Sequence, residues 1–267
     1  MANLIRSAKS GSDWTQGDLD AYNIYVTPQD TATFFGILVL PEPRVPEEIL
    51  NVHEADDMMN DENARLIDLL DVAMLPPARE SEESAVDDFV VELFRLLGYV
   101  GRRRYARTRK DLFLPICGET RHAKTDVCIV DRLRNHILLL VQEDKRHGEH
   151  SSFADTEARL IVEGIAAFVY NNEARRASGL PELQEKIMAG IIMVGTTPTF
   201  YKVPVTADLV FNLRHGRFPI QRTEVSVCFA PVARQHRRWS EGMKPLDNRR
   251  TILSCYEAFK AIAEIND

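Results

Sequence analysis

The chain has 267 residues, of which 45% are hydrophobic and 27% charged, and its formal net charge at pH 7 is −7. This composition is typical of a globular protein with one large domain, or one domain and an extension. No apolar run reaches the ~20 residues of a transmembrane helix, and the N-terminus lacks the apolar block of a signal peptide. We therefore expect an intracellular protein of the nucleus or cytoplasm, with no membrane partner.

The charge is distributed unevenly along the chain. Residues 42–92 carry 16 Asp and Glu against 3 Lys and Arg, a net of −13, whereas residues 93–267 carry 28 Lys and Arg against 20 Asp and Glu, a net of +8. The total charge therefore does not exclude a nucleic-acid partner for the second part. The acidic segment either folds over or beside a basic surface, or forms a small helical subdomain whose acids are solvated.

The first 80 residues are predicted to form an acidic, partly helical N-terminal extension. Residues 61–75 have helical spacing of apolar side chains, and the stretch at 75–83, with two prolines and several charges, is typical of a linker. A second domain is predicted over residues 81–267.

From Ser81 onward helices and strands alternate in an order typical of a layered α/β domain. Ser81 is placed to cap a helix that Gly98 ends, and a basic stretch follows it. Two strands, 125–131 and 136–145, form a hairpin around residues 132–135. The later prediction is a helix at 155–176, strands at 186–196 and 199–206, a helix at 207–216, a strand at 223–232 and a helix at 248–265.

Several carboxylates are expected to meet at one end of the hairpin. With a four-residue loop, Asp131 faces His136 and Asp126 faces Val141, which makes Glu143 the diagonal neighbour of Asp126 on one face, with Lys145 beyond it. Glu83 and Glu157 each begin the apolar stripe of a helix and so point inward. Clustered carboxylates repel one another unless a cation lies between them, and oxygen ligands suit Mg²⁺ or Mn²⁺.

These motifs resemble the PD-(D/E)XK nuclease superfamily. The matching residues are Asp126 at the opening of a strand, with Thr125 in place of the usual proline, and Glu143-Asp144-Lys145 at the end of the next strand, with a helix before and after the hairpin. The resemblance covers about residues 81–170, and the chain as a whole resembles members of this superfamily from mushroom-forming fungi. It implies a restriction-endonuclease-like core, a mixed sheet flanked by helices.

The resemblance also implies an activity, the metal-dependent hydrolysis of phosphodiester bonds in DNA or RNA. Asp126, Glu143 and the main-chain carbonyl of Asp144 would hold Mg²⁺ or Mn²⁺, with Glu83 acting directly or through water. Lys145 would orient the attacking water and stabilise the transition state. Glu157 and Gln142 are possible accessory residues.

Each of these assignments has an alternative. The charges at Asp126, Glu143 and Lys145 could form a salt-bridged strand end, and the domain could bind nucleic acid or protein without turnover. The basic residues are either phosphate contacts or a solvated loop. The predicted nucleic-acid contacts are Arg102, Arg103, Arg104, Arg107, Arg109 and Lys124. A weaker candidate is the basic stretch 234–239.

Overall fold

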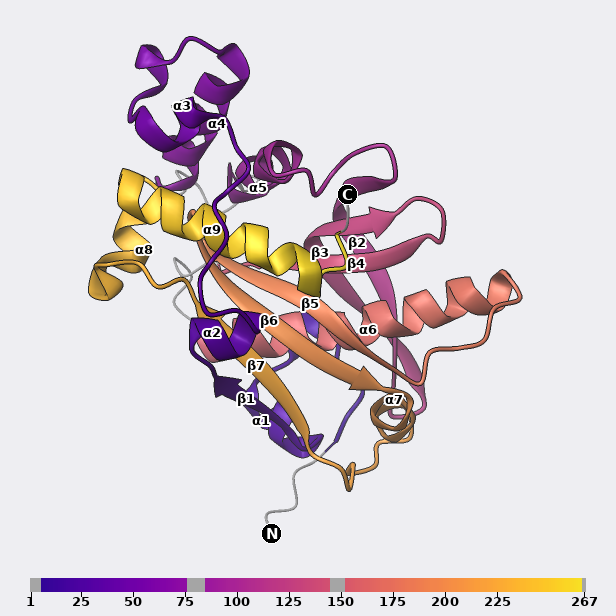
Figure 1. Cartoon of the computed structure of the whole chain (residues 1–267). Helices are drawn as coiled ribbons and strands as arrows, with labels where there is room; N and C mark the ends of the chain where they lie inside the picture. The colour runs from indigo at the N-terminus through magenta and orange to yellow at the C-terminus, as the bar shows by residue number, and fades with distance from the viewer. Residues whose placement is uncertain (1–5, 76–84, 145–151, 266–267) are drawn as a thin grey trace.

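A computed structural model describes residues 6–75, 85–144 and 152–265 (Figure 1). Its strands are β1 (Ile24–Pro28), β2 (Arg104–Ile116), β3 (Glu119–Asp131), β4 (His136–Glu143), β5 (Glu185–Val194), β6 (Thr197–Thr206) and β7 (Thr223–Phe229).

The helices flank these strands. The longer ones are α4 (Asp61–Ala73), α5 (Ala85–Leu96), α6 (Phe153–Ala177), α7 (Ala207–Arg214) and α9 (Leu246–Ile262). The shorter ones are α1 (Gln16–Ala21), α2 (Thr31–Phe35), α3 (Glu47–Asn51) and α8 (Arg238–Glu241), with single 3-10 turns at Gly11–Asp13, Ala55–Asp57 and Gln235–Arg237.

The seven strands form one mixed sheet in the order β1-β7-β6-β5-β4-β3-β2. The pairs β4–β5 and β1–β7 are parallel, and the other neighbours are antiparallel. Helices cover both faces (Figure 1). One apolar core joins the sheet to α5 and α9, and a second joins it to α1 and α6. We call these the α5–α9 face and the α6 face. The predicted α/β class, a mixed sheet flanked by helices, is confirmed.

Most predicted elements appear within a few residues of their expected bounds. Both strands of the hairpin, the helix after it and the five later elements are present. Gly98 follows α5 with a φ of 74°, a left-handed conformation that favours glycine at a helix end. The exception is β2, which occupies the stretch interpreted as a basic loop. Lys110, Leu112 and the next two alternate residues are buried there, a strand pattern that the arginines obscured.

Helix α6 lies close against the sheet because the residue of β5 beneath it is a glycine, Gly190. A side chain at Gly190 would place its Cβ 2.9 Å from Leu160 of α6. Fourteen of the helix's 25 residues are buried, which is why it has no solvated polar face along its middle. Among the helices that the structure describes, none is long and apolar enough to cross a membrane.

The described part of the predicted N-terminal extension is built into the sheet and the core. Strand β1 pairs with β7, and Phe34 of α2 stacks on Phe259 of α9 at 6.3 Å between ring centroids. The guanidinium of Arg249 in α9 donates to the main-chain carbonyls of Ile49 and Val52. Removing residues 1–80 would therefore take away strand β1 and part of the core. Such a truncated chain cannot show whether the acidic segment limits access to a basic surface, because the fold itself would be changed. The predicted linker lies largely outside the described residues.

Candidate active site at the end of strand β4

The hairpin register differs from the prediction. Asp131 pairs with His136 as expected, but a bulge between Ile129 and Val130 shifts the pairing, so that Val127 lies opposite Val141. The cause is one extra residue in β4, Leu138, because Ile129 pairs with Leu139 and Val130 with Ile137. The expectation that Asp126 faces Val141 is wrong.

The bulge changes which side chains share a face. Glu143 pairs in parallel with Met193 and so lies on the α5–α9 face, where Met193 is buried. Gln142 pairs with Ile192, which belongs to the core of the α6 face. The structure therefore places Glu143 and Gln142 on opposite faces, and Asp126 interacts with both residues.

Asp126 lies at the point where β3 and β4 separate. Its Oδ2 accepts two hydrogen bonds of 2.8 Å, one from the Gln142 side-chain amide and one from the Glu143 main-chain N–H. The carboxylate thus takes the place of a ladder partner for Glu143. Asp126 and Glu143 are brought together, but through the main chain of Glu143 and not as two carboxylates on one face.

Asp144 continues the strand toward β5 and α6. Its main-chain N–H donates to the Met193 carbonyl at 2.9 Å, and its buried carboxylate accepts a hydrogen bond of 3.1 Å from Thr156 of α6. The other two predicted members of the site, Glu83 and Lys145, lie outside the described residues.

Glu163 of α6 is a carboxylate at this site that the prediction missed. Its side chain is 3% exposed. Burial raises the pKa of Glu163 well above its ordinary value, the nearby charge of Asp126 raises it further, and Arg159 opposes the shift. The sequence signal was a single charged residue among the ten residues 160–169, of which the other nine are apolar or small.

Glu157, the predicted accessory residue, has a partner of its own. The Tyr201 hydroxyl donates to Glu157 Oε1 at 2.7 Å. Burial raises the pKa of the Glu157 carboxyl, and the Tyr201 hydrogen bond partly offsets that rise. Glu157 therefore belongs to a contact between α6 and β6.

The predicted phosphate contacts divide into two groups. The Arg104 guanidinium donates to the carbonyls of Gly98 and Tyr99 and so holds the turn that follows α5. The exposed residues Arg107, Arg109 and Lys124 lie within two register positions of Asp126 along β2 and β3. Arg102 and Arg103 are exposed in the turn before β2.

Arg109 marks a break in the β2–β3 ladder. Its φ is +51°, a left-handed value that is strained in a strand, and it lies between the pairs Thr108–Val127 and Lys110–Thr125, opposite Asp126. The two strands change faces here, since Ala123 packs on the α6 face and Val127 on the α5–α9 face. The exposed Arg109 and the candidate ligand Asp126 therefore lie opposite each other where the β2–β3 pairing is interrupted.

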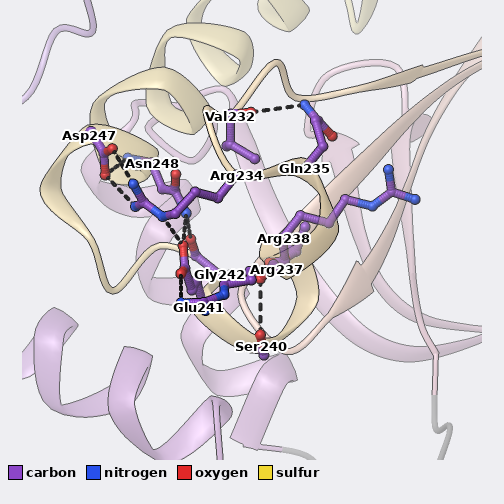
Figure 2. A network of polar contacts seen from close by, with 11 residues as sticks. Val232, Arg234, Gln235, Arg237, Arg238, Ser240, Glu241, Gly242, Asp247 and Asn248 are labelled. Atoms are coloured by element: carbon purple, nitrogen blue, oxygen red, sulfur yellow. Dashed lines mark hydrogen bonds and ion pairs between the residues drawn. The ribbon is translucent and has the colours of Figure 1, made fainter.

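The second basic stretch, residues 234–239, is mostly engaged within the protein. Figure 2 shows Arg234 between two carboxylates. Its Nη1 and Nη2 both donate to Asp247 at 3.1 Å, and its Nε donates to Glu241 at 2.6 Å. These bonds hold the pKa of both carboxyls below their ordinary values. Arg238 extends away from this network in Figure 2, and its guanidinium lies over the rings of Phe229 and Trp239. Arg234 is therefore a structural residue of the loop.

The oxygen ligands at the end of β4 suit a hard divalent cation. Within the three described ranges no group of three His, Cys, Asp or Glu side chains is placed to hold a metal ion. Mg²⁺ does not need such a group, because it keeps several waters and binds one or two carboxylates. Asp126, whose carboxylate lies against the Glu143 main chain, is one such carboxylate.

Comparison with known proteins gives no family assignment, since no protein-family model and no curated protein matches the chain.

Proposed function

We propose that this protein is a nuclease that hydrolyses phosphodiester bonds in DNA or RNA with Mg²⁺ or Mn²⁺. The observation that carries the proposal is the contact of Asp126 with the Glu143 main chain at the end of β4, directly before Asp144 and Lys145. The resemblance to the PD-(D/E)XK superfamily assigns these four residues to its motif.

The order of the elements supports the same proposal. A helix (α5), an antiparallel hairpin (β3–β4), a second helix (α6) and a strand parallel to β4 (β5) follow one another in the chain. This is the helix, hairpin and helix on which the motif is expected, and a restriction-endonuclease-like core is part of the proposal.

The residues of the chain have distinct roles in the proposed reaction. A bound Mg²⁺ would lower the pKa of a water molecule and neutralise charge on the phosphate oxygens. The resemblance assigns the ion to Asp126, Glu143 and the Asp144 carbonyl, although the Glu143 side chain lies on the α5–α9 face. Lys145 would orient the water that attacks phosphorus as the P–O bond breaks. Arg107, Arg109 and Lys124 would hold the phosphates on either side.

The hairpin register favours a second candidate function, nucleic-acid or protein binding without turnover. Asp126 and Glu143 lie on one face in the sequence-based expectation. With the bulge in β4, the Gln142 side chain and not that of Glu143 meets Asp126, and the Glu143 side chain lies on the α5–α9 face. A binding module needs the basic surface along β2 but not two convergent carboxylates.

Cleavage assays separate the two functions. The protein is incubated with single- and double-stranded DNA and RNA in Mn²⁺ or Mg²⁺, beside Asp126→Asn and Lys145→Ala. Asp111→Asn serves as a control, because this carboxylate of β2 is exposed and pairs with His122. We expect metal-dependent cleavage that both site variants abolish and the control retains. Salt-sensitive binding without cleavage in any metal would support the binding module instead.

A further inference from the structure

Helix α6 is fixed along β4 by hydrogen bonds at both ends. Near its start Thr156 donates to Asp144, and near its end the Asn171 side chain bonds both the N–H and the carbonyl of Ile137, at 2.7 and 2.9 Å. Asp144 directly follows β4 and Ile137 is its second residue, so the helix runs antiparallel to the strand. Glu163 lies midway between Thr156 and Asn171 on the same stripe, and thus over the middle of the strand.

Two buried oxygens, one on α6 and one on the side of β4 that faces it, lack a hydrogen-bond partner within the part of the chain that the structure describes. One is Glu163 Oε2, and the other is Oε1 of Gln142, a residue that is 8% exposed. The amide nitrogen of Gln142 is occupied by Asp126, which fixes the orientation of its oxygen. A buried acceptor without a donor destabilises the fold, so these two oxygens need an explanation.

We propose that Asp126, Gln142 and Glu163 form a divalent-cation site on the α6 face, with Glu163 and Gln142 supplying ligands from α6 and β4. The inference rests on the proposed function for its role, since Asp126 of the motif is the third ligand. The Glu143 side chain, on the α5–α9 face, is not part of this site. Two carboxylates and an amide oxygen are the ligand types that Mg²⁺ and Mn²⁺ bind. The cation would supply the positive charge that an ionised, buried Glu163 requires.

Arg159, one turn before Glu163, is the competing source of that charge. Its Nε is buried and has no partner among the described residues, and its charge acts on Glu163. In that arrangement a buried ion pair between helix residues replaces the cation, and metal binding does not depend on Glu163.

Mn²⁺ binding to the full chain distinguishes the two arrangements. Titration of wild type, Glu163→Gln and Glu163→Asp is followed by calorimetry and by the metal-induced shift in Tm. Glu173→Gln is the control, because this carboxylate of α6 is exposed. We expect Glu163→Gln to weaken Mn²⁺ binding at least about tenfold and to remove most of the Tm shift. In EDTA its Tm should equal or exceed that of wild type, because the buried carboxylate is gone.

The inference is overturned if Glu163→Gln binds Mn²⁺ within twofold of wild type, or if wild type binds no Mn²⁺. Should Glu163→Gln fail to fold, the same criteria apply to Glu163→Asp, which keeps the charge and shortens the side chain. Cleavage by wild type with unchanged Mn²⁺ affinity in the variant would remove this inference and leave the proposed function. Glu163-dependent Mn²⁺ binding without cleavage of any substrate would support the cation site and contradict the proposed nuclease function.

Discussion

The two faces of the sheet each bury a charged helix residue, and the two residues are satisfied very differently. On the α5–α9 face Arg249 is 1% exposed, and its guanidinium donates to the carbonyls of Ile49, Val52, His53, Met243 and Lys244. On the α6 face Glu163 is 3% exposed, and one of its oxygens has no partner in the described ranges.

The difference separates a structural charge from a candidate functional one. A buried charge whose donors all meet acceptors fixes the chain around it, as Arg249 does for α3 and the start of α9. A buried carboxylate with an unused oxygen, close to a second carboxylate, is more costly and suits a site that takes up a cation. The contrast predicts opposite effects of neutral substitutions at the two positions.

The largest effect on stability is expected at Arg249. Arg249→Met should lower the free energy of unfolding by about 3–5 kcal/mol, since it removes the donor of five carbonyls, two of them in fully buried hydrogen bonds. Urea denaturation gives this value. Arg250→Met is the control, because its exposed partner Glu42 makes an ion pair that contributes less than about 1 kcal/mol. Equal losses of unfolding free energy in Arg249→Met and Arg250→Met would contradict a structural role for the buried Arg249.

A smaller loss is expected where α6 is tied to β4. Asn171→Ala removes both hydrogen bonds to the Ile137 peptide and should cost about 1–3 kcal/mol in urea denaturation. It should also weaken Mn²⁺ binding, because Glu163 depends on the position of the helix. Asn212→Ala in α7, whose amide bonds only within its own helix, provides the comparison. Unchanged stability in Asn171→Ala would show that the helix does not need this anchor.

The smallest effect depends on pH and concerns Glu157. Tyr201→Phe removes the hydrogen bond that stabilises the ionised carboxylate, so the pKa of Glu157, already raised by burial, rises further. A carboxyl with a raised folded-state pKa favours the fold at low pH and loses that contribution as pH rises. The variant should therefore be less stable than wild type by about 1–2 kcal/mol at pH 8, with a smaller difference at pH 4. A difference that does not vary with pH would exclude Glu157 as its cause.

Sequence patterns predicted the elements better than the geometry of the site. Alternating and helical periods are local, and they placed α5, α6 and most strands from β3 onward within a few residues. The bulge at Leu138 has no such signal, because β4 is buried over its first seven residues and one extra apolar residue leaves the pattern unchanged. That single residue changes which carboxylates share a face.

Two further differences have physical causes. Strand β2 was missed because its first half is exposed and rich in arginine, and only the later half alternates between buried and exposed residues. Glu163 was missed because its possible role depends on Asp126 and Gln142, which lie on other elements. Asp126 bonds Gln142, and its charge acts on Glu163, but neither relation is visible in the sequence. The apolar run around it was the signal available in the sequence.

The central claim is that Asp126 organises a metal-dependent phosphodiesterase site at the end of β4. Its most direct test is the rate of cleavage of a labelled single-stranded or duplex substrate with Mn²⁺, measured for wild type, Asp126→Asn and Asp111→Asn. We predict cleavage that EDTA abolishes, a loss of roughly a hundredfold or more in Asp126→Asn, and a rate within twofold of wild type in Asp111→Asn. Cleavage by Asp126→Asn at the wild-type rate, or no cleavage of DNA or RNA by the wild type in either metal, would contradict the claim.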